Sequence, residues 1–321
     1  MLNQQFLKSV RRISLAAGLL ACTAAPAWAD KFASYVIDLD SDRVLHSRNA
    51  DDARYPASLT KVMTLYMVFD ALKAGELMLS DKLTVTSYAA SQPPSKLALK
   101  PGSTISVEDA INALVTKSAN DVAVVIAERL GGSESRFAAL MTAKARQLGL
   151  KNTRFKNASG LHDPRQSSTA HDLALLGEAI MVNHAEYYDY FSTRQFDWAD
   201  RSYKNHNKLL GEVRGVDGIK TGYTRASGFN LLASAERDGH RVIAVMMGGS
   251  SSRSRNEHVE NLLEAAFETL DAEAADSKPT LRARIAFGDI EAPTTADLNA
   301  AQLDDLDEDT AEIIDQGSGP E

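Results

Sequence analysis

Apolar positions along the chain repeat with two different periods, and the change of period divides the sequence. Runs of β-formers at 32–38 and 43–47, on either side of a Ser41-Asp42 turn, predict a hairpin. Apolar residues spaced three or four positions apart then predict helices through the middle of the chain. Their expected positions are 58–74, 106–117, 120–130, 133–149 and from 169 onward.

Strand-like patterns return after the helices. They occupy 216–223, 228–235 and 241–248, and the last two are joined by an Asp-Gly turn of the kind found in hairpins. A closing helix is expected at 256–270. Strands therefore come from both ends of the chain, with helices between them. The predicted fold class is α+β: an antiparallel β-sheet flanked by helices, in which the N-terminal hairpin pairs with the C-terminal strands.

The first 29 residues match a secretory signal peptide. Lys8, Arg11 and Arg12 form a basic head, an apolar run follows at 13–22, and Ala27-Trp28-Ala29 supplies small residues at a cleavage site. We expect cleavage after Ala29 and secretion across the inner membrane. A lipoprotein box ending at Cys22 is the weaker alternative, because the small-residue site lies just downstream.

The net charge of −8 comes from the C-terminal end of the chain. Eleven acidic residues and no Lys or Arg follow Arg284, which leaves the body of the protein near neutral. No basic patch indicates a nucleic-acid partner. The end of the chain from 273 to 321 is expected to be an acidic tail, mostly disordered.

A serine and a lysine at the start of the first predicted helix form the first chemical motif. Ser58-Leu59-Thr60-Lys61 places the two side chains one helical turn apart. A serine hydroxyl becomes a good nucleophile when a base removes its proton. Lysine acts as that base when desolvation or a nearby cation makes its amine partly neutral.

Two further motifs follow along the chain. Ser118 and Asn120 flank Ala119 between two predicted helices, where a hydroxyl can relay a proton and an amide can bond a substrate. Lys220-Thr221-Gly222 ends a predicted strand, where charge and a hydroxyl can hold a carboxylate and glycine lets a substrate backbone approach. Each motif alone is weak evidence. Together they form the S-x-x-K, S-x-N and K-T-G set of β-lactamases and penicillin-binding proteins.

The chain resembles the serine D-Ala-D-Ala carboxypeptidases, the low-molecular-mass penicillin-binding proteins of the peptidase S11 family. The similarity covers about residues 30–272, which we expect to be a D,D-peptidase catalytic domain. It extends beyond the three motifs to longer stretches: YPASLTKVMT (55–64), SQPPSK (91–96), LVTKSANDV (114–122), NASGL (157–161) and GVDGIKTGYTRASGFN (215–230). The resemblance implies the penicillin-binding protein and β-lactamase-like transpeptidase fold.

The resemblance also implies catalytic roles. Ser58 is expected to be the nucleophile, Lys61 its base, and Ser118 the group that passes the proton to the leaving D-alanine. The oxyanion hole is expected from the backbone N–H groups of Ser58 and Tyr223. No cofactor and no metal are expected, since the histidines lack metal-ligand spacing.

The remaining expected site residues bind substrate. Asn120 is expected to orient the peptide, and Lys220 and Thr221, with Gly222 and Tyr223 beside them, to hold its terminal carboxylate. The resemblance also implies a carboxylate-binding arginine after the last strand. Arg255 fits that position, with Arg253 as the alternative.

The expected partners are peptidoglycan stem peptides ending in D-Ala-D-Ala, and β-lactam antibiotics. A D,D-endopeptidase or a β-lactamase using the same site, and a catalytically silent peptidoglycan-binding module, are the alternatives. Many family members end in a β-rich domain and a membrane-binding amphipathic helix, neither of which is evident here. We expect a periplasmic protein, either soluble or in weak peripheral association with the membrane, because the acidic tail lacks a basic amphipathic face.

Overall fold

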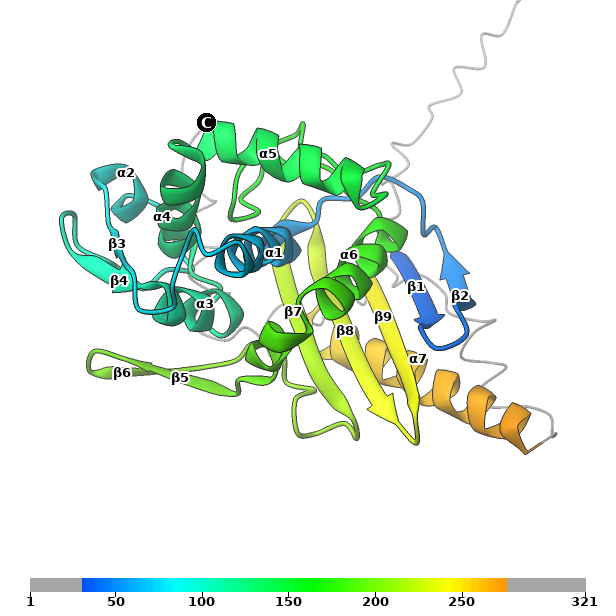
Figure 1. The fold of residues 1–321 in the computed structure, drawn as a ribbon. Coiled ribbons are helices and arrows are strands. Elements are labelled where there is room, and N and C mark those ends of the chain that lie inside the picture. Colours follow the sequence, from blue (N-terminus) through cyan, green and yellow to red (C-terminus); the bar gives the residue numbers. More distant parts are fainter. Residues whose placement is uncertain (1–30, 276–321) are drawn as a thin grey trace, which may run out of the picture. The chain divides into compact units, whose positions relative to one another are not determined.

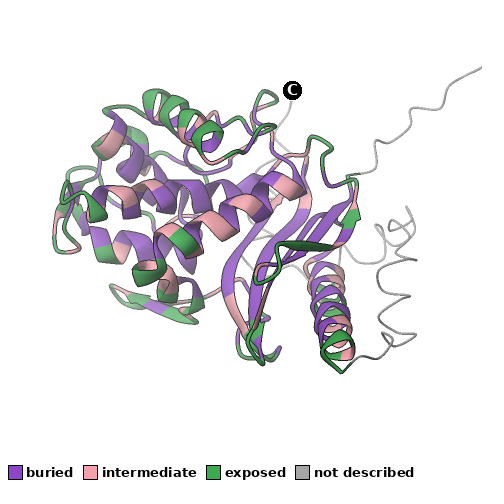
Figure 2. Ribbon diagram, turned by 45° about the vertical axis from the view of Figure 1, so that its right-hand side comes forward, coloured by how far each residue is buried: buried purple, intermediate pink, exposed green. Residues whose placement is uncertain are grey.

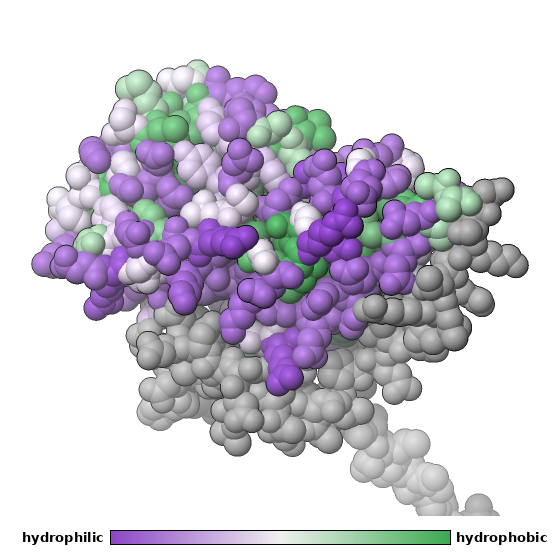
Figure 3. All heavy atoms as spheres, turned by 90° about the horizontal axis from the view of Figure 1, so that it is seen from below, coloured by the Kyte–Doolittle hydropathy of each residue, from purple (hydrophilic) through white to green (hydrophobic). Residues whose placement is uncertain are grey.

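The computed structural model describes residues 31–275. The expected signal peptide at 1–29 lies outside the described residues, as does the acidic tail from residue 276 onward. No helix between residues 31 and 275 has both the length and the apolar character required to span a bilayer. In the face shown in Figure 3, hydrophilic side chains surround small apolar patches.

Five strands form one antiparallel sheet (Figure 1). The order across the sheet is β2-β1-β9-β8-β7. Its strands are β1 (Ala33–Asp38), β2 (Arg43–Arg48), β7 (Val216–Thr224), β8 (Gly228–Arg237) and β9 (His240–Gly249). Because β1 pairs with β9, the predicted joining of the two chain ends in one sheet is confirmed.

Several of the main helices, the two that start at Thr60 and Asn120 excepted, begin where the sequence places a side-chain cap. Ser106, Ser133 and Thr169 each accept a hydrogen bond from a backbone N–H in the first turn of the helix that follows. The helices are α1 (Thr60–Lys73), preceded by the 3₁₀ turn η1 (Ala57–Leu59), α3 (Val107–Val115), α4 (Asn120–Gly131), α5 (Glu134–Gln147), α6 (Ala170–Asn183) and α7 (Ser252–Ala274).

The two faces of the sheet pack against different helices, in agreement with the expected antiparallel sheet flanked by helices. Alternate side chains such as Val36, Leu231 and Val242 pack under α7. The intervening ones, such as Ile37 and Ile243, face the core that contains α1 and α6. Figures 1 and 2 show α7 on one side of the sheet and α6 on the other, with purple buried positions along the strands.

The sequence pattern missed the smallest elements and misplaced one helix start. The closing helix begins at Ser252 instead of 256, because Ser251 and Ser254 form a capping box there. It also continues to Ala274, so positions 273 and 274, which the sequence pattern assigns to the tail, are helical. The missed elements have only three to eight residues each, too few to show a period. They are β3 (Lys82–Thr84), α2 (Ser87–Ala90), β4 (Thr104–Ser106), the 3₁₀ segment η2 (Ala185–Ser192), β5 (Gln195–Trp198) and β6 (Arg201–Lys204).

Replacement of a leucine under the sheet tests how much α7 contributes to stability. Leu263 is fully buried between α7 and the strands, so Leu263→Ala should lower the free energy of unfolding by about 3 kcal/mol. Leu140, on α5, is 40% exposed. Leu140→Ala should therefore change the free energy of unfolding by less than about 1 kcal/mol. Urea denaturation of both variants measures the difference, and equal losses would contradict this account of the core.

Candidate active site

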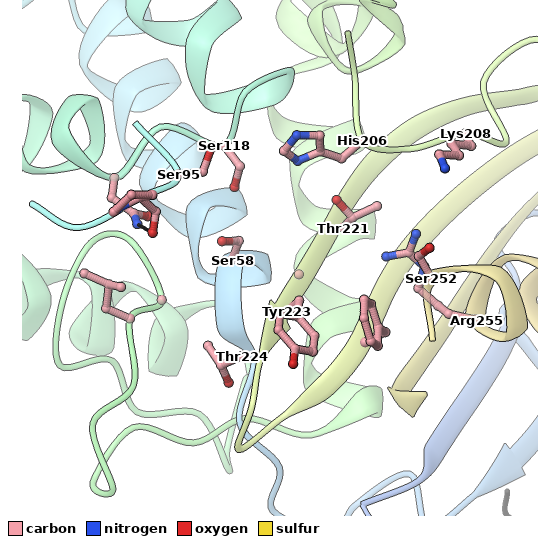
Figure 4. A pocket seen from close by; sticks show the side chains of 16 residues that line it. Ser58, Ser95, Ser118, His206, Lys208, Thr221, Tyr223, Thr224, Ser252 and Arg255 are labelled. Carbon is pink, nitrogen blue, oxygen red and sulfur yellow. Dashed lines mark hydrogen bonds between the residues drawn. The ribbon is translucent and has the colours of Figure 1, made fainter. Parts of the chain in front are cut away.

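A pocket lies where α1, the turn before α4, β7 and the start of α7 meet (Figure 4). Residues of all three sequence motifs line it, among them Ser58, Ser118 and Thr221. Arg255 contributes from α7. The fold therefore brings together chemical groups that are far apart in the sequence.

Ser58 and Lys61 are joined by a hydrogen bond at the start of α1. Ser58 lies in the η1 turn, and Lys61 follows one turn later. The Lys61 Nζ donates to Ser58 Oγ at 3.1 Å. This contact is the one that the Ser-x-x-Lys spacing predicts.

Lys61 is fully buried, and this position controls its basicity. Its Nζ also donates to Asn120 Oδ1 at 2.8 Å and to the carbonyl of Ser159 at 2.6 Å. Burial lowers the Lys61 pKa well below 10.5, and the positive charge of Lys220 lowers it further, while Asp121 acts in the opposite direction. The amine is thereby brought toward the neutral form that a base requires.

Ser118 has an unusual backbone and an unengaged hydroxyl. Its φ of 60° lies in the left-handed region, which costs free energy for a residue other than glycine. The side chain is 5% exposed, and its Oγ has no hydrogen-bond partner within residues 31–275. Figure 4 shows it on the same side of the pocket as Ser58, with its hydroxyl toward the cavity. A buried hydroxyl in this setting is ready to bond a reacting group.

Asn120 uses both ends of its side-chain amide within the protein. Oδ1 accepts from Lys61, and Nδ2 donates to the carbonyls of Pro93 and Pro94, both at 3.0 Å. These bonds tie the 93–94 loop to the catalytic lysine. Asn120 also lines the pocket, so it reaches the substrate space from a fixed position.

Gly222 matters for a reason that the sequence did not reveal. A Cβ there would lie 3.0 Å from the backbone nitrogen of Ser58 and 3.1 Å from the carbonyl oxygen of Pro56. The turn that carries Ser58 therefore already lies close against β7 at this glycine, in addition to any substrate that binds there. The neighbouring Tyr223 lines the pocket and packs on Phe229, with ring centroids 4.2 Å apart.

Lys220 is the second buried lysine of the site. It is 2% exposed and donates from Nζ to the carbonyl of Thr221. Burial, and then the charge of Arg255, lower the Lys220 pKa to about 7. Lys220 and Arg255 thus concentrate positive charge at one end of the pocket, beside Thr221.

The structure separates the two candidate arginines. Arg255 is 4% exposed, lines the pocket, and is held by bonds to Asn256 Oδ1 and the carbonyl of Asn230. Arg253 has a side chain 74% exposed and forms a surface ion pair with Glu257. Of the two, Arg255 is the one that a substrate in the pocket can reach.

Several pocket residues lay outside the predicted set. The 157–161 stretch supplies the Ser159 carbonyl for Lys61, and Gly160, whose added Cβ would lie 1.9 Å from the carbonyl oxygen of Ala57. Of the other additions, four line the pocket from loops: Ser95, Leu161, His206 and Lys208. Two more, Thr224 and Ser252, lie at the end of β7 and the start of α7. Only the similarity of the 91–96 and 157–161 stretches to the family drew attention to two of these loops.

Comparisons with known proteins agree with this geometry. Residues 22–251 match the Peptidase_S11 family model, described as D-alanyl-D-alanine carboxypeptidase. The D-alanyl-D-alanine carboxypeptidase DacF of Bacillus subtilis is 37% identical over 240 residues, which are 72% of this chain and 61% of the relative. This chain therefore spans less than two thirds of the length of that protein.

Two solved structures have the same fold. Penicillin-binding protein 5 of Haemophilus influenzae is 36% identical, with a TM-score of 0.71 over 73% of this chain and 70% of the other. Penicillin-binding protein D2 of Listeria monocytogenes, in its ampicillin-bound form, is 33% identical, with a TM-score of 0.64 over 73% of this chain and 96% of the other. The predicted fold class and family are both confirmed. The chain belongs to the D-alanyl-D-alanine carboxypeptidase family of serine hydrolases, peptidase S11.

Proposed function

We propose that this protein removes the terminal D-alanine from peptidoglycan stem peptides through an acyl-enzyme on Ser58. The observation that carries the proposal is the position of the Ser58–Lys61 pair. It lies in the same pocket as Thr221 and the buried Arg255. A nucleophile activated by its own base thus faces groups suited to a free carboxylate.

Acylation begins at Ser58. Neutral Lys61 takes the proton from Ser58 Oγ, which attacks the carbonyl carbon of the penultimate D-alanine. The backbone N–H groups of Ser58 and Tyr223 stabilise the oxyanion. Ser118 passes a proton to the departing amine, and the terminal D-alanine leaves. Water then hydrolyses the ester, which releases the shortened peptide and restores Ser58.

The substrate is held at its carboxyl end. Thr221 and Arg255 bind the terminal carboxylate, and Lys220 adds positive charge beside them. Asn120 orients the peptide while it fixes Lys61.

Two further proposals concern partners and location. The ampicillin-bound Listeria relative and the shared site support acylation of Ser58 by β-lactams. The sequence pattern at 1–29 supports export to the periplasm, with residues 30–272 as the catalytic domain and 273–321 as an acidic tail. Weak peripheral contact with the membrane remains part of this proposal.

Release of D-alanine from a D-Ala-D-Ala-terminated peptide is the direct test. The mature protein should release one D-alanine per peptide, and Ser58→Ala should reduce release to background because no acyl-enzyme can form. Ser118→Ala should retain penicillin labelling better than Ser58→Ala. Penicillin labelling of the wild type without D-alanine release would contradict the carboxypeptidase proposal.

The two arginines provide a matched pair of variants. Arg255→Gln should lower kcat/KM for the peptide about ten- to hundredfold, since a hydrogen bond to a charged group contributes about 1.5–3 kcal/mol. Arg253→Gln removes the same charge from an exposed position and should leave kcat/KM unchanged. Steady-state kinetics distinguish the two, and similar losses in both would remove Arg255 from the carboxylate site.

The pH dependence of penicillin acylation tests the lysine pair. The acylation rate should rise with pH as Lys61 loses its proton. This rising limb of the pH–rate profile should lie well below pH 10.5. Lys220→Gln removes a positive charge that lowers the Lys61 pKa, so the limb should move to higher pH. Lys208→Gln, at the pocket rim, should leave it in place. A limb that stays fixed in Lys220→Gln would contradict the coupling.

A further inference from the structure

The end of the sheet remote from the pocket brings together three side chains of the kinds that bind metal ions. Asp38 ends β1, Asp40 lies in the turn after it, and His240 begins β9. Each residue offers one ligand atom, and the three atoms lie within 4.8 Å of one another. The pocket, in contrast, adjoins the other end of β9, which leads into α7 at Ser252.

Strand register explains why these side chains meet. Asp38 pairs with Val242, and the Leu39 N–H donates to the carbonyl of Arg241. Continued by one step, the same register sets Asp40 opposite His240. Side chains two positions apart on a strand lie on one face, and directly opposed residues share that face. The backbone therefore directs all three toward the same side of the sheet.

Two of the ligand atoms are buried without a hydrogen bond. Asp38 is 1% exposed, and its Oδ2 accepts from Ser41. Within residues 31–275, neither Asp38 Oδ1 nor His240 Nδ1 has a hydrogen-bond partner. They lie 3.9 Å apart, too far for a hydrogen bond between them. A metal ion about 2.0–2.2 Å from each atom fits between them.

The surrounding charges favour a cation at this position. Asp38 and Asp40 contribute two negative charges. Arg43, which pairs with Asp38 across the hairpin, has its guanidinium bound to Glu273 at 3.0 and 2.6 Å. Arg241 is bound to Asp217 and Glu236. Both neighbouring arginines are thus engaged by other carboxylates, and a divalent cation would neutralise the aspartates.

We propose that Asp38, Asp40 and His240 form a binding site for a divalent transition-metal ion, Zn²⁺ or Mn²⁺. Two carboxylate oxygens and one imidazole nitrogen suit these ions, with water completing the coordination. The bound ion would link the β1–β2 hairpin to the β8–β9 hairpin and stabilise this end of the sheet. No motif indicated this set, because the two aspartates lie early in the chain and His240 lies in its last third, without a metal-ligand spacing.

Calorimetric titration of the tag-free full chain with ZnCl₂ and with MnCl₂ tests the site. We expect one ion to bind per chain. His240→Gln and Asp40→Asn should each weaken binding at least about tenfold, since even residues that only orient a metal ligand commonly contribute that much. Asp42→Asn is the matched control. Asp42 is an acidic residue in the same exposed turn, but it is not one of the three ligands.

Thermal unfolding provides the second measurement. The metal that binds should raise Tm in the wild type and in Asp42→Asn, because it binds only the folded state, and should not do so in His240→Gln. Failure of both ions to bind the wild type would overturn the proposal. Undiminished binding in a His240→Gln, Asp40→Asn double variant would also overturn it, since the ion would then be held elsewhere in the chain.

Discussion

A lysine amine buried away from water has to be supplied with hydrogen-bond partners, and most of the active site can be understood from that requirement. Lys61 is fully buried, and its Nζ reaches Ser58, Asn120 and Ser159. These acceptors come from the start of α1, the start of α4 and the 157–161 loop. A displacement of any of the three would leave a polar group unsatisfied in a low-dielectric interior, which is costly. The amine therefore holds three distant segments in one arrangement, and the same burial lowers its pKa toward the neutral form that can accept a proton.

Close backbone contact completes that arrangement. Gly160 and Gly222 both approach the turn that carries Ser58, each at a distance that a side chain would prevent. Asp121, next to Asn120, accepts from the backbone N–H groups of Leu97 and Leu99 and so fixes the loop that carries Ser95. The groups that touch substrate are thus positioned by residues that do not, and changes at those residues should affect catalysis through geometry.

The sequence was sufficient for the elements with strong periodicity and clear caps. The long strands, the helices that begin after Ser106, Ser133 and Thr169, and the Ser58–Lys61 contact all depend on local spacing. It was insufficient where a role depends on a contact between distant segments. Neither the Ser159 carbonyl as a lysine partner nor the approach of Gly222 to Ser58 follows from any short pattern. The choice of Arg255 over Arg253 likewise required the helix to begin at Ser252, earlier than its apolar period indicates.

The two ends of β9 show opposite solutions to the burial of polar groups. Near the pocket, Lys61 and Arg255 are buried with hydrogen-bond partners supplied by the protein. At the other end, Asp38 Oδ1 and His240 Nδ1 are buried 3.9 Å apart, and neither has a hydrogen bond within residues 31–275. Direct charge pairing and a shared metal ion are two explanations of this arrangement. Asp40 distinguishes the two explanations: a direct bond between Asp38 and His240 has no need of a third acidic group, whereas a metal ion does. Its carboxylate is fixed by the N–H of Arg241 at 2.6 Å, within reach of both other ligands. A third ligand already held in place favours the ion, because less conformational entropy is then lost when it binds.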